Sequence, residues 1–176
     1  ITGASEVTVT GAGGTRVLVA RKGIVINTGT DPAIPPLEGL ADTPYWTNRE
    51  VVQAERVPES LIVLGGGATG AEFTQVFARF GTAVTLVEAL PRLLSFEEPE
   101  ASELIERIFT AEGIKVYTNA PAERVSHNGT HFSVHLGMNT LTAERLLVST
   151  GRRTDLAALG VAAAGLDPTA KTIPTD

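Results

Sequence analysis

The chain has 176 residues, of which 43% are hydrophobic and 19% charged, a composition typical of a globular domain and not of a disordered or coiled-coil segment. Its net charge is -6, so the surface lacks the positive field that attracts nucleic acid or anionic membranes. No stretch approaches the ~20 consecutive apolar residues of a transmembrane helix. We therefore expect a cytoplasmic protein without a nucleic-acid or membrane partner. The chain contains no cysteine, which excludes an internal disulfide or dithiol.

The amino-terminal part predicts short antiparallel strands followed by a linker. Residues 6–10 and 15–20 alternate apolar and polar side chains around a glycine-rich turn, which indicates a β-hairpin. Residues 23–27 are expected to add a third strand and complete a β-meander. Prolines then crowd residues 31–44, which favours a linker and places the first domain boundary there. A short helix is expected from Thr47 to about residue 54.

The central part predicts an alternation of buried strands and amphipathic helices. The expected order is strand, helix, strand, helix, strand, over residues 61–64, 71–80, 83–87, 97–113 and 114–118. The first of these strands is entirely aliphatic, which is typical of a strand buried on both faces of a parallel sheet. This order predicts an α/β fold with a Rossmann-like, doubly wound parallel sheet and right-handed crossovers.

The carboxy-terminal part returns to short strands. Residues 123–126 and 130–136 flank Asn128-Gly129, a strong hairpin signal, and residues 146–149 predict one more strand. One short helix is expected within residues 156–166. Three histidines recur at intervals of four, which would suit a metal on a helix, but the hairpin places them on strands and we expect no metal site.

The strongest functional signal is Gly65-Gly66-Gly67-Ala68-Thr69-Gly70, which fits the G-x-G-x-x-G pattern of dinucleotide-binding loops. It directly follows an expected strand and opens an expected helix. Gly65 permits the tight turn, Gly67 lets the backbone approach a pyrophosphate, and Gly70 lets the helix pack closely on the strand. The helix amino terminus then stabilises the phosphate charge.

An acidic residue, Glu88, ends the next expected strand, where it can accept hydrogen bonds from the hydroxyls of the adenosine ribose. A carboxylate at this place repels a 2′-phosphate, so NAD is favoured over NADP. Arg92, four residues further on, leaves NADP open, because it can either reach a 2′-phosphate or pair with Glu88.

The chain resembles the FAD-dependent pyridine nucleotide-disulfide oxidoreductases, the family of dihydrolipoamide dehydrogenase, mercuric reductase and glutathione reductase. The similarity covers nearly the whole sequence and is carried by three stretches. Residues 65–88 are similar to the family's nucleotide-binding βαβ start. Residues 27–32, Asn-Thr-Gly-Thr-Asp-Pro, resemble its A-T-G-S-x-P motif, and residues 147–155 resemble its A-T-G-R-x-P-N motif on return to the flavin domain.

The resemblance implies a division of the chain and a set of cofactor contacts. Residues 1–43 would be a segment of the FAD domain containing the meander and linker, residues 44–147 the NAD(P)-binding domain, and residues 148–176 the return into the FAD domain, so that hairpin segments of a split FAD domain flank the sheet. Glu72 would lie near the nicotinamide, Ala122 beside adenine, and Gly151 where nicotinamide meets flavin. FAD would be contacted by Thr28, Gly29 and Thr30.

The sequence also departs from the family. Ala68-Thr69 stands where many members have Tyr-Ile, and Thr154-Asp155 replaces Pro-Asn. The family's flavin fingerprint, C-x4-C dithiol and interface domain have no counterpart here, so we expect an excerpt of a longer polypeptide. It would contain no catalytic residue and would be inactive alone.

The resemblance also implies that the parent protein is a homodimer in which this domain presents NAD(P)H for hydride transfer to FAD and onward to a disulfide. Two alternatives stay open: a flavoprotein of this architecture without a redox disulfide, such as an NADH oxidase or ferredoxin reductase, or a non-catalytic nucleotide-binding module.

Overall fold

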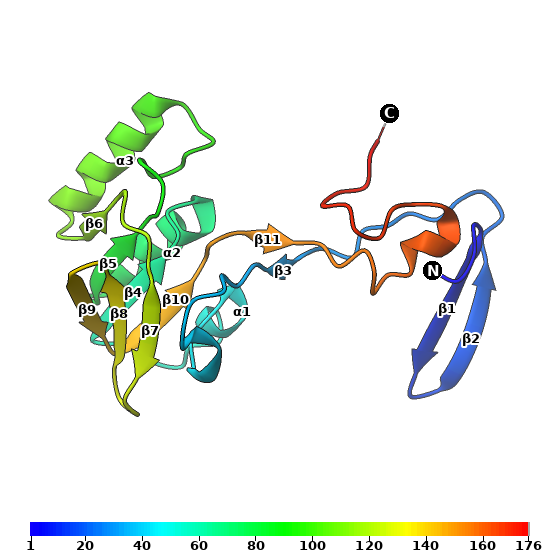
Figure 1. Cartoon of the computed structure of the whole chain (residues 1–176), viewed down its shortest axis with the longest axis horizontal. Coiled ribbons are helices and arrows are strands. Elements are labelled where there is room, and N and C mark those ends of the chain that lie inside the picture. Colours follow the sequence, from blue (N-terminus) through cyan, green and yellow to red (C-terminus); the bar gives the residue numbers. More distant parts are fainter. Residues whose placement is uncertain (176) are drawn as a thin grey trace. The chain divides into compact units, whose positions relative to one another are not determined.

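The computed structural model describes residues 1–175, which form two compact units (Figure 1). The first contains Ile1–Asp31 and the chain from Arg152 onward, and the second contains Pro32–Gly151. The division falls within β3 (Asp31–Pro32) and just before β11 (Arg152–Arg153). Within the described part of the chain, no helix has the length and hydropathy needed to cross a membrane.

The first unit contains the predicted hairpin. Strands β1 (Glu6–Gly11) and β2 (Gly14–Val19) pair antiparallel, and Gly14 makes the turn with a φ of 97°. The expected third strand over residues 23–27, and with it the amino-terminal meander, is wrong. Residues 23–27 form no strand, and the Val25 side chain is 91% exposed. The expected carboxy-terminal helix is a single 3-10 turn, η2 (Val161–Ala164).

The proline-rich linker contributes to the second unit. Its 3-10 turn η1 (Leu40–Asp42) buries Leu40, which is 1% exposed and packs with Ile62 and Val125. The second unit is therefore wider than the predicted domain of residues 44–147. The short helix α1 (Asn48–Val51) begins at a capping box, in which the Thr47 hydroxyl accepts from the Arg49 amide and Glu50 accepts from the Thr47 amide.

A four-stranded parallel sheet forms the centre of the second unit, as predicted. Its order is β10 (Arg145–Val148), β4 (Ser60–Leu64), β5 (Ala83–Val87) and β6 (Lys115–Tyr117), and every neighbouring pair is parallel. Two helices, α2 (Ala68–Arg79) and α3 (Pro99–Ala111), connect the strands and cover one face. On this face Leu61 and Val63 of β4 pack with Phe77 of α2 and Phe109 of α3.

The other face of the parallel sheet is covered by strands and not by helices. The antiparallel strands β7 (Arg124–His127), β8 (Phe132–Leu136) and β9 (Asn139–Ala143) form a three-stranded meander. Phe132 and Val134 of β8, both fully buried, pack with Ile62 of β4. Alternate residues of β4 thus serve two different cores, because successive side chains of a strand point to opposite faces.

The hairpin between β7 and β8 turns at Asn128-Gly129, as predicted. The Asn128 side-chain oxygen accepts from the amides of Thr130 and His131, at 3.0 and 2.9 Å. The histidines of these strands engage protein neighbours, for example the His127 ring, which lies 4.5 Å from that of Phe132. Among residues 1–175, no group of three His, Cys, Asp or Glu side chains is placed to hold a metal ion.

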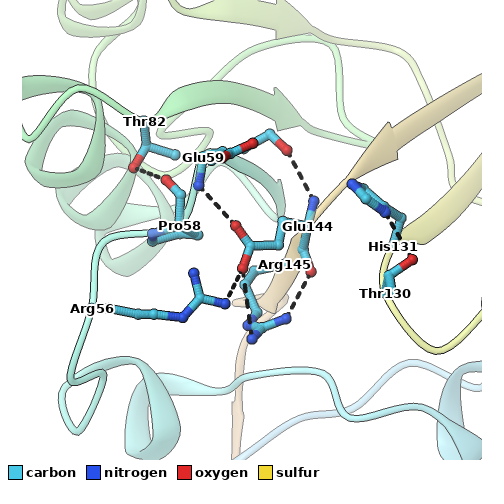
Figure 2. A network of polar contacts seen from close by, with 9 residues as sticks. Arg56, Pro58, Glu59, Thr82, Thr130, His131, Glu144 and Arg145 are labelled. Carbon is cyan, nitrogen blue, oxygen red and sulfur yellow. Dashed lines mark hydrogen bonds and ion pairs between the residues drawn. The ribbon is translucent and has the colours of Figure 1, made fainter.

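At the amino ends of the parallel strands, Glu144 connects the segment of residues 56–60, which leads into β4, with the start of β10 (Figure 2). Its carboxylate accepts from the Glu59 amide at 2.9 Å and pairs with Arg56, while its own amide donates to Ser60 Oγ at 2.9 Å. The Arg145 guanidinium lies 3.7 Å from the same carboxylate. The hydrogen bond from the Glu59 amide is the main cause that lowers the pKa of Glu144, and the hydrogen bond from Arg56 is the second. The network fixes where β4 and β10 begin.

We expect Glu144→Gln to destabilise the protein at neutral pH and to have little effect in acid. A carboxyl whose pKa is lowered by folding stabilises the fold above its unfolded pKa of about 4.3, and this contribution is lost as pH falls through the folded pKa. The loss at pH 7 should be about 1–3 kcal/mol, since the side chain is only 14% exposed. Urea unfolding of wild type, Glu144→Gln and the control Glu103→Gln, from about pH 7 to about pH 3, measures it. An equal loss at both ends of this range would contradict the charge-dependent role.

Candidate functional site

A pocket of about 490 Å³ opens at the carboxyl ends of the parallel strands. Its walls come from the segments that follow β4, β5, β6 and β10, at Gly65, Glu88, Ala120 and Ser149. In open α/β sheets ligands bind at this edge, in the crevice formed by the loops that follow the carboxyl ends of the strands.

The floor of the pocket is the glycine loop between β4 and α2. Gly65 has a φ of 104°, and its amide donates to the Val87 carbonyl at 2.8 Å. A side chain at Gly65 would place its Cβ 2.5 Å from the Ser149 carbonyl oxygen, and one at Gly70 would collide with the Gly65 carbonyl. Both glycines are therefore required by close packing of α2, β4 and the end of β10.

Gly67 differs from its neighbours because no atom lies within 4 Å of the position a Cβ would take. It is exposed, lines the pocket and forms the N-cap of α2 without a side-chain cap. The first amides of any α-helix have no partner within the helix. The loop thus combines open space with unpaired N–H groups and the positive end of a helix dipole, an arrangement suited to an anion such as a pyrophosphate.

Glu88 lines the pocket immediately after β5, and two backbone amides fix its carboxylate. Oε2 accepts from the Gly66 amide at 2.6 Å, and Oε1 accepts from the Leu90 amide at 2.7 Å. Each carboxylate oxygen has capacity for a second hydrogen bond. Glu88 is therefore a pre-positioned acceptor beside the glycine loop.

The loop over residues 94–97 forms another wall, and Arg92 shapes it. The Arg92 guanidinium donates to the carbonyls of Leu94, Ser95 and Glu97 at 3.2, 2.7 and 2.8 Å, and to Ser102 Oγ at 2.7 Å. Leu94 has a φ of 47°, and its amide donates to the Gly66 carbonyl at 2.8 Å. The sequence left open an ion pair between Arg92 and Glu88. In the structure the Arg92 guanidinium instead donates hydrogen bonds to this loop and to Ser102.

The residues predicted to bind the nicotinamide nucleotide fall into three groups. Six of them line the pocket: Gly65, Gly67, Ala68, Glu88, Ala122 and Gly151. Gly66, Thr69 and Gly70 belong to the same loop and helix start. The expected helix over residues 71–80 would place Glu72 in its first turn. Because α2 begins at Ala68, Glu72 is instead an exposed residue of the second turn.

The residues expected to contact FAD, Thr28, Gly29 and Thr30, belong to the first unit. There the Arg152 guanidinium donates to the Thr30 hydroxyl.

Sequence reasoning missed several walls of the pocket. These are the loop over residues 94–97, Pro121 and Ser149, together with Pro35 and Leu37 of the linker. No motif marks them, since they meet only in the folded chain. Phe96 carries one usable signal: it is an aromatic residue beside three acidic positions and outside the apolar stripe of the following helix.

Comparison with known proteins agrees with this architecture. Residues 1–176 match the family described as pyridine nucleotide-disulphide oxidoreductase. A mercuric reductase from Shewanella putrefaciens is 38% identical over 153 residues, covering 87% of this chain and 27% of that protein. One from Acidithiobacillus ferrooxidans is 40% identical over 154 residues, covering 88% of this chain and 28% of the other.

A similar structure is the HOCl-induced flavoprotein disulfide reductase RclA from Escherichia coli. It superposes with a TM-score of 0.89 at 30% identity, covering all of this chain and 40% of RclA. The chain thus spans little more than a quarter of the two mercuric reductases and two fifths of RclA. The sequence match, the parallel sheet and the glycine loop lead to one conclusion: the chain belongs to the pyridine nucleotide-disulphide oxidoreductase family.

Proposed function

We propose that the second unit binds NAD(H) in the pocket at the carboxyl ends of the strands. The observation that carries the proposal is the pairing of Gly67 with Glu88 in one pocket. Gly67 offers open space and helix-start amides for a pyrophosphate, and Glu88 offers a fixed carboxylate for ribose hydroxyls.

The pocket favours NAD over NADP. A 2′-phosphate bound beside Glu88 would meet a carboxylate that two amides hold in place. None of the described residues that line the pocket is Lys or Arg. Arg92, the cation nearest in sequence, directs its guanidinium to the loop carbonyls. A dianionic phosphate would therefore lose its hydration without gaining a cationic partner.

In the whole protein we propose that this domain orients NADH for transfer of a hydride to FAD, from which electrons pass to a disulfide outside this chain. FAD would supply the two-electron chemistry, and this chain's residues would supply binding and orientation. Thr28, Gly29 and Thr30 would contact FAD, Glu72 and Gly151 would border the nicotinamide, and Ala122 the adenine. We also propose that the whole protein is a cytoplasmic homodimer. In it the partners of this domain would be the rest of the FAD domain and an interface domain. Alone, the chain would bind nucleotide without turnover.

Calorimetric titration of the chain with NADH and NADPH, at one salt concentration, tests the proposal. We expect NADH to bind at least about tenfold more tightly. Glu88→Ala should weaken NADH binding by about 10- to 100-fold, because charge-assisted hydrogen bonds to the ribose are lost, and should weaken NADPH binding less. Glu103→Ala, on the exposed surface of α3, is the control. Tighter NADPH binding would overturn the cofactor choice, and no binding of either nucleotide would overturn the function.

A further inference from the structure

We propose that Phe96 is the platform on which the adenine ring of the nucleotide stacks. The inference rests on the proposed function and assigns a residue to the end of the pocket that the glycine loop does not reach. Phe96 lines the pocket, yet it is 99% exposed. A phenylalanine ring with both faces in water lacks the burial that usually stabilises an aromatic side chain. A flat apolar ligand would restore that burial.

The backbone that carries Phe96 is held on both sides. Before it, the carbonyls of Leu94 and Ser95 accept from Arg92, and the Leu94 amide donates to Gly66. After it, the Glu97 carbonyl accepts from Arg92 and the Glu97 amide donates to the Leu94 carbonyl at 2.8 Å. The exposed ring therefore stands on a braced turn, and binding a base would require little ordering of the backbone.

The neighbouring walls have the chemistry of a purine site. Ala89, Leu90, Pro121 and Ala122 line the pocket with small or apolar side chains. In a dinucleotide the adenosine ribose joins the pyrophosphate to the adenine. With the pyrophosphate on the glycine loop and the ribose on Glu88, the adenine must lie on the walls beyond Glu88. Among the described residues that line this pocket, Phe96 is the one with an aromatic side chain.

The test measures NADH binding to the whole chain with four substitutions. Phe96→Ala and Phe96→Ile should each weaken binding by about 5- to 50-fold, because stacking on a base requires a planar face. Phe96→Tyr should bind within about twofold of wild type, since it keeps the ring. Phe80→Ala removes another exposed phenylalanine, 66% exposed at the end of α2 and outside the pocket lining, and should change nothing.

A second ligand separates adenine recognition from a general effect on the pocket. Binding of ADP-ribose, which retains adenine, ribose and pyrophosphate but lacks nicotinamide, should fall with Phe96→Ala by the same factor as NADH. Wild-type-like binding of NADH by Phe96→Ala, or by Phe96→Ile, would overturn the platform while leaving the proposed function intact. Failure of the wild-type chain to bind NADH would instead overturn the function itself.

Discussion

Gly70→Ala is expected to unfold α2 from the sheet locally and to abolish nucleotide binding. A methyl group at this position would collide with the Gly65 carbonyl and lie 2.8 Å from Ser149 Oγ. Both obstacles are fixed: Ser149 Oγ donates to the carbonyls of Leu64 and Gly65, at 2.9 and 3.1 Å. Neither can move unless the ends of β4 and β10 separate. We expect a loss of about 2–4 kcal/mol in unfolding free energy and binding weakened by at least about 100-fold.

Gly67→Ala is the matched control for this experiment. Its φ of -72° suits alanine, and a Cβ there would meet no atom within 4 Å. Stability should therefore change by less than about 0.5 kcal/mol, while NADH binding weakens because the methyl group enters the space for the pyrophosphate. Urea unfolding and calorimetry separate the two effects. A Gly70→Ala protein as stable as wild type would show that the helix and strand do not need this close approach.

Arg92→Leu is expected to release the loop over residues 94–97 and to weaken NADH and NADPH equally. The substitution removes four hydrogen bonds from a guanidinium and leaves three loop carbonyls without that donor. We expect a loss of about 2–3 kcal/mol in stability and about tenfold weaker nucleotide binding, since a wall of the pocket would lose its shape. Arg92→Lys should rescue little, because an ammonium group cannot reproduce the fork of donors.

The ratio of NADH to NADPH affinity is the decisive readout for Arg92. If the guanidinium recognised a 2′-phosphate, Arg92→Leu would weaken NADPH alone and raise the ratio. A positioning role through the loop leaves the ratio unchanged while both affinities fall. Arg107→Leu, on the exposed surface of α3, controls for the change in net charge. A selective loss of NADPH binding would therefore contradict the role that the hydrogen bonds assign.

Local patterns predicted those elements whose stability depends on their own side chains. The aliphatic run at the core of β4, the spacing that produced α2 and the Asn128-Gly129 turn all led to elements in the observed places. The segment over residues 23–27 contains three consecutive aliphatic residues but forms no strand, because a local apolar run cannot provide a neighbour with which to pair. Strand β9 was missed for the opposite reason: its sequence is polar, and pairing with β8 and burial of Ala143 make it a strand.

The sequence by itself determined the parallel sheet, the glycine loop and the acidic residue at the end of β5, because each depends on residue type at fixed spacing. Only the tertiary structure decided what surrounds them. The fixed orientation of Glu88 comes from amides at Gly66 and Leu90, and the partners of Arg92 are carbonyls, which every residue possesses and no pattern marks. The role of Phe96 likewise depends on exposure at a shared pocket, a property of the folded chain alone.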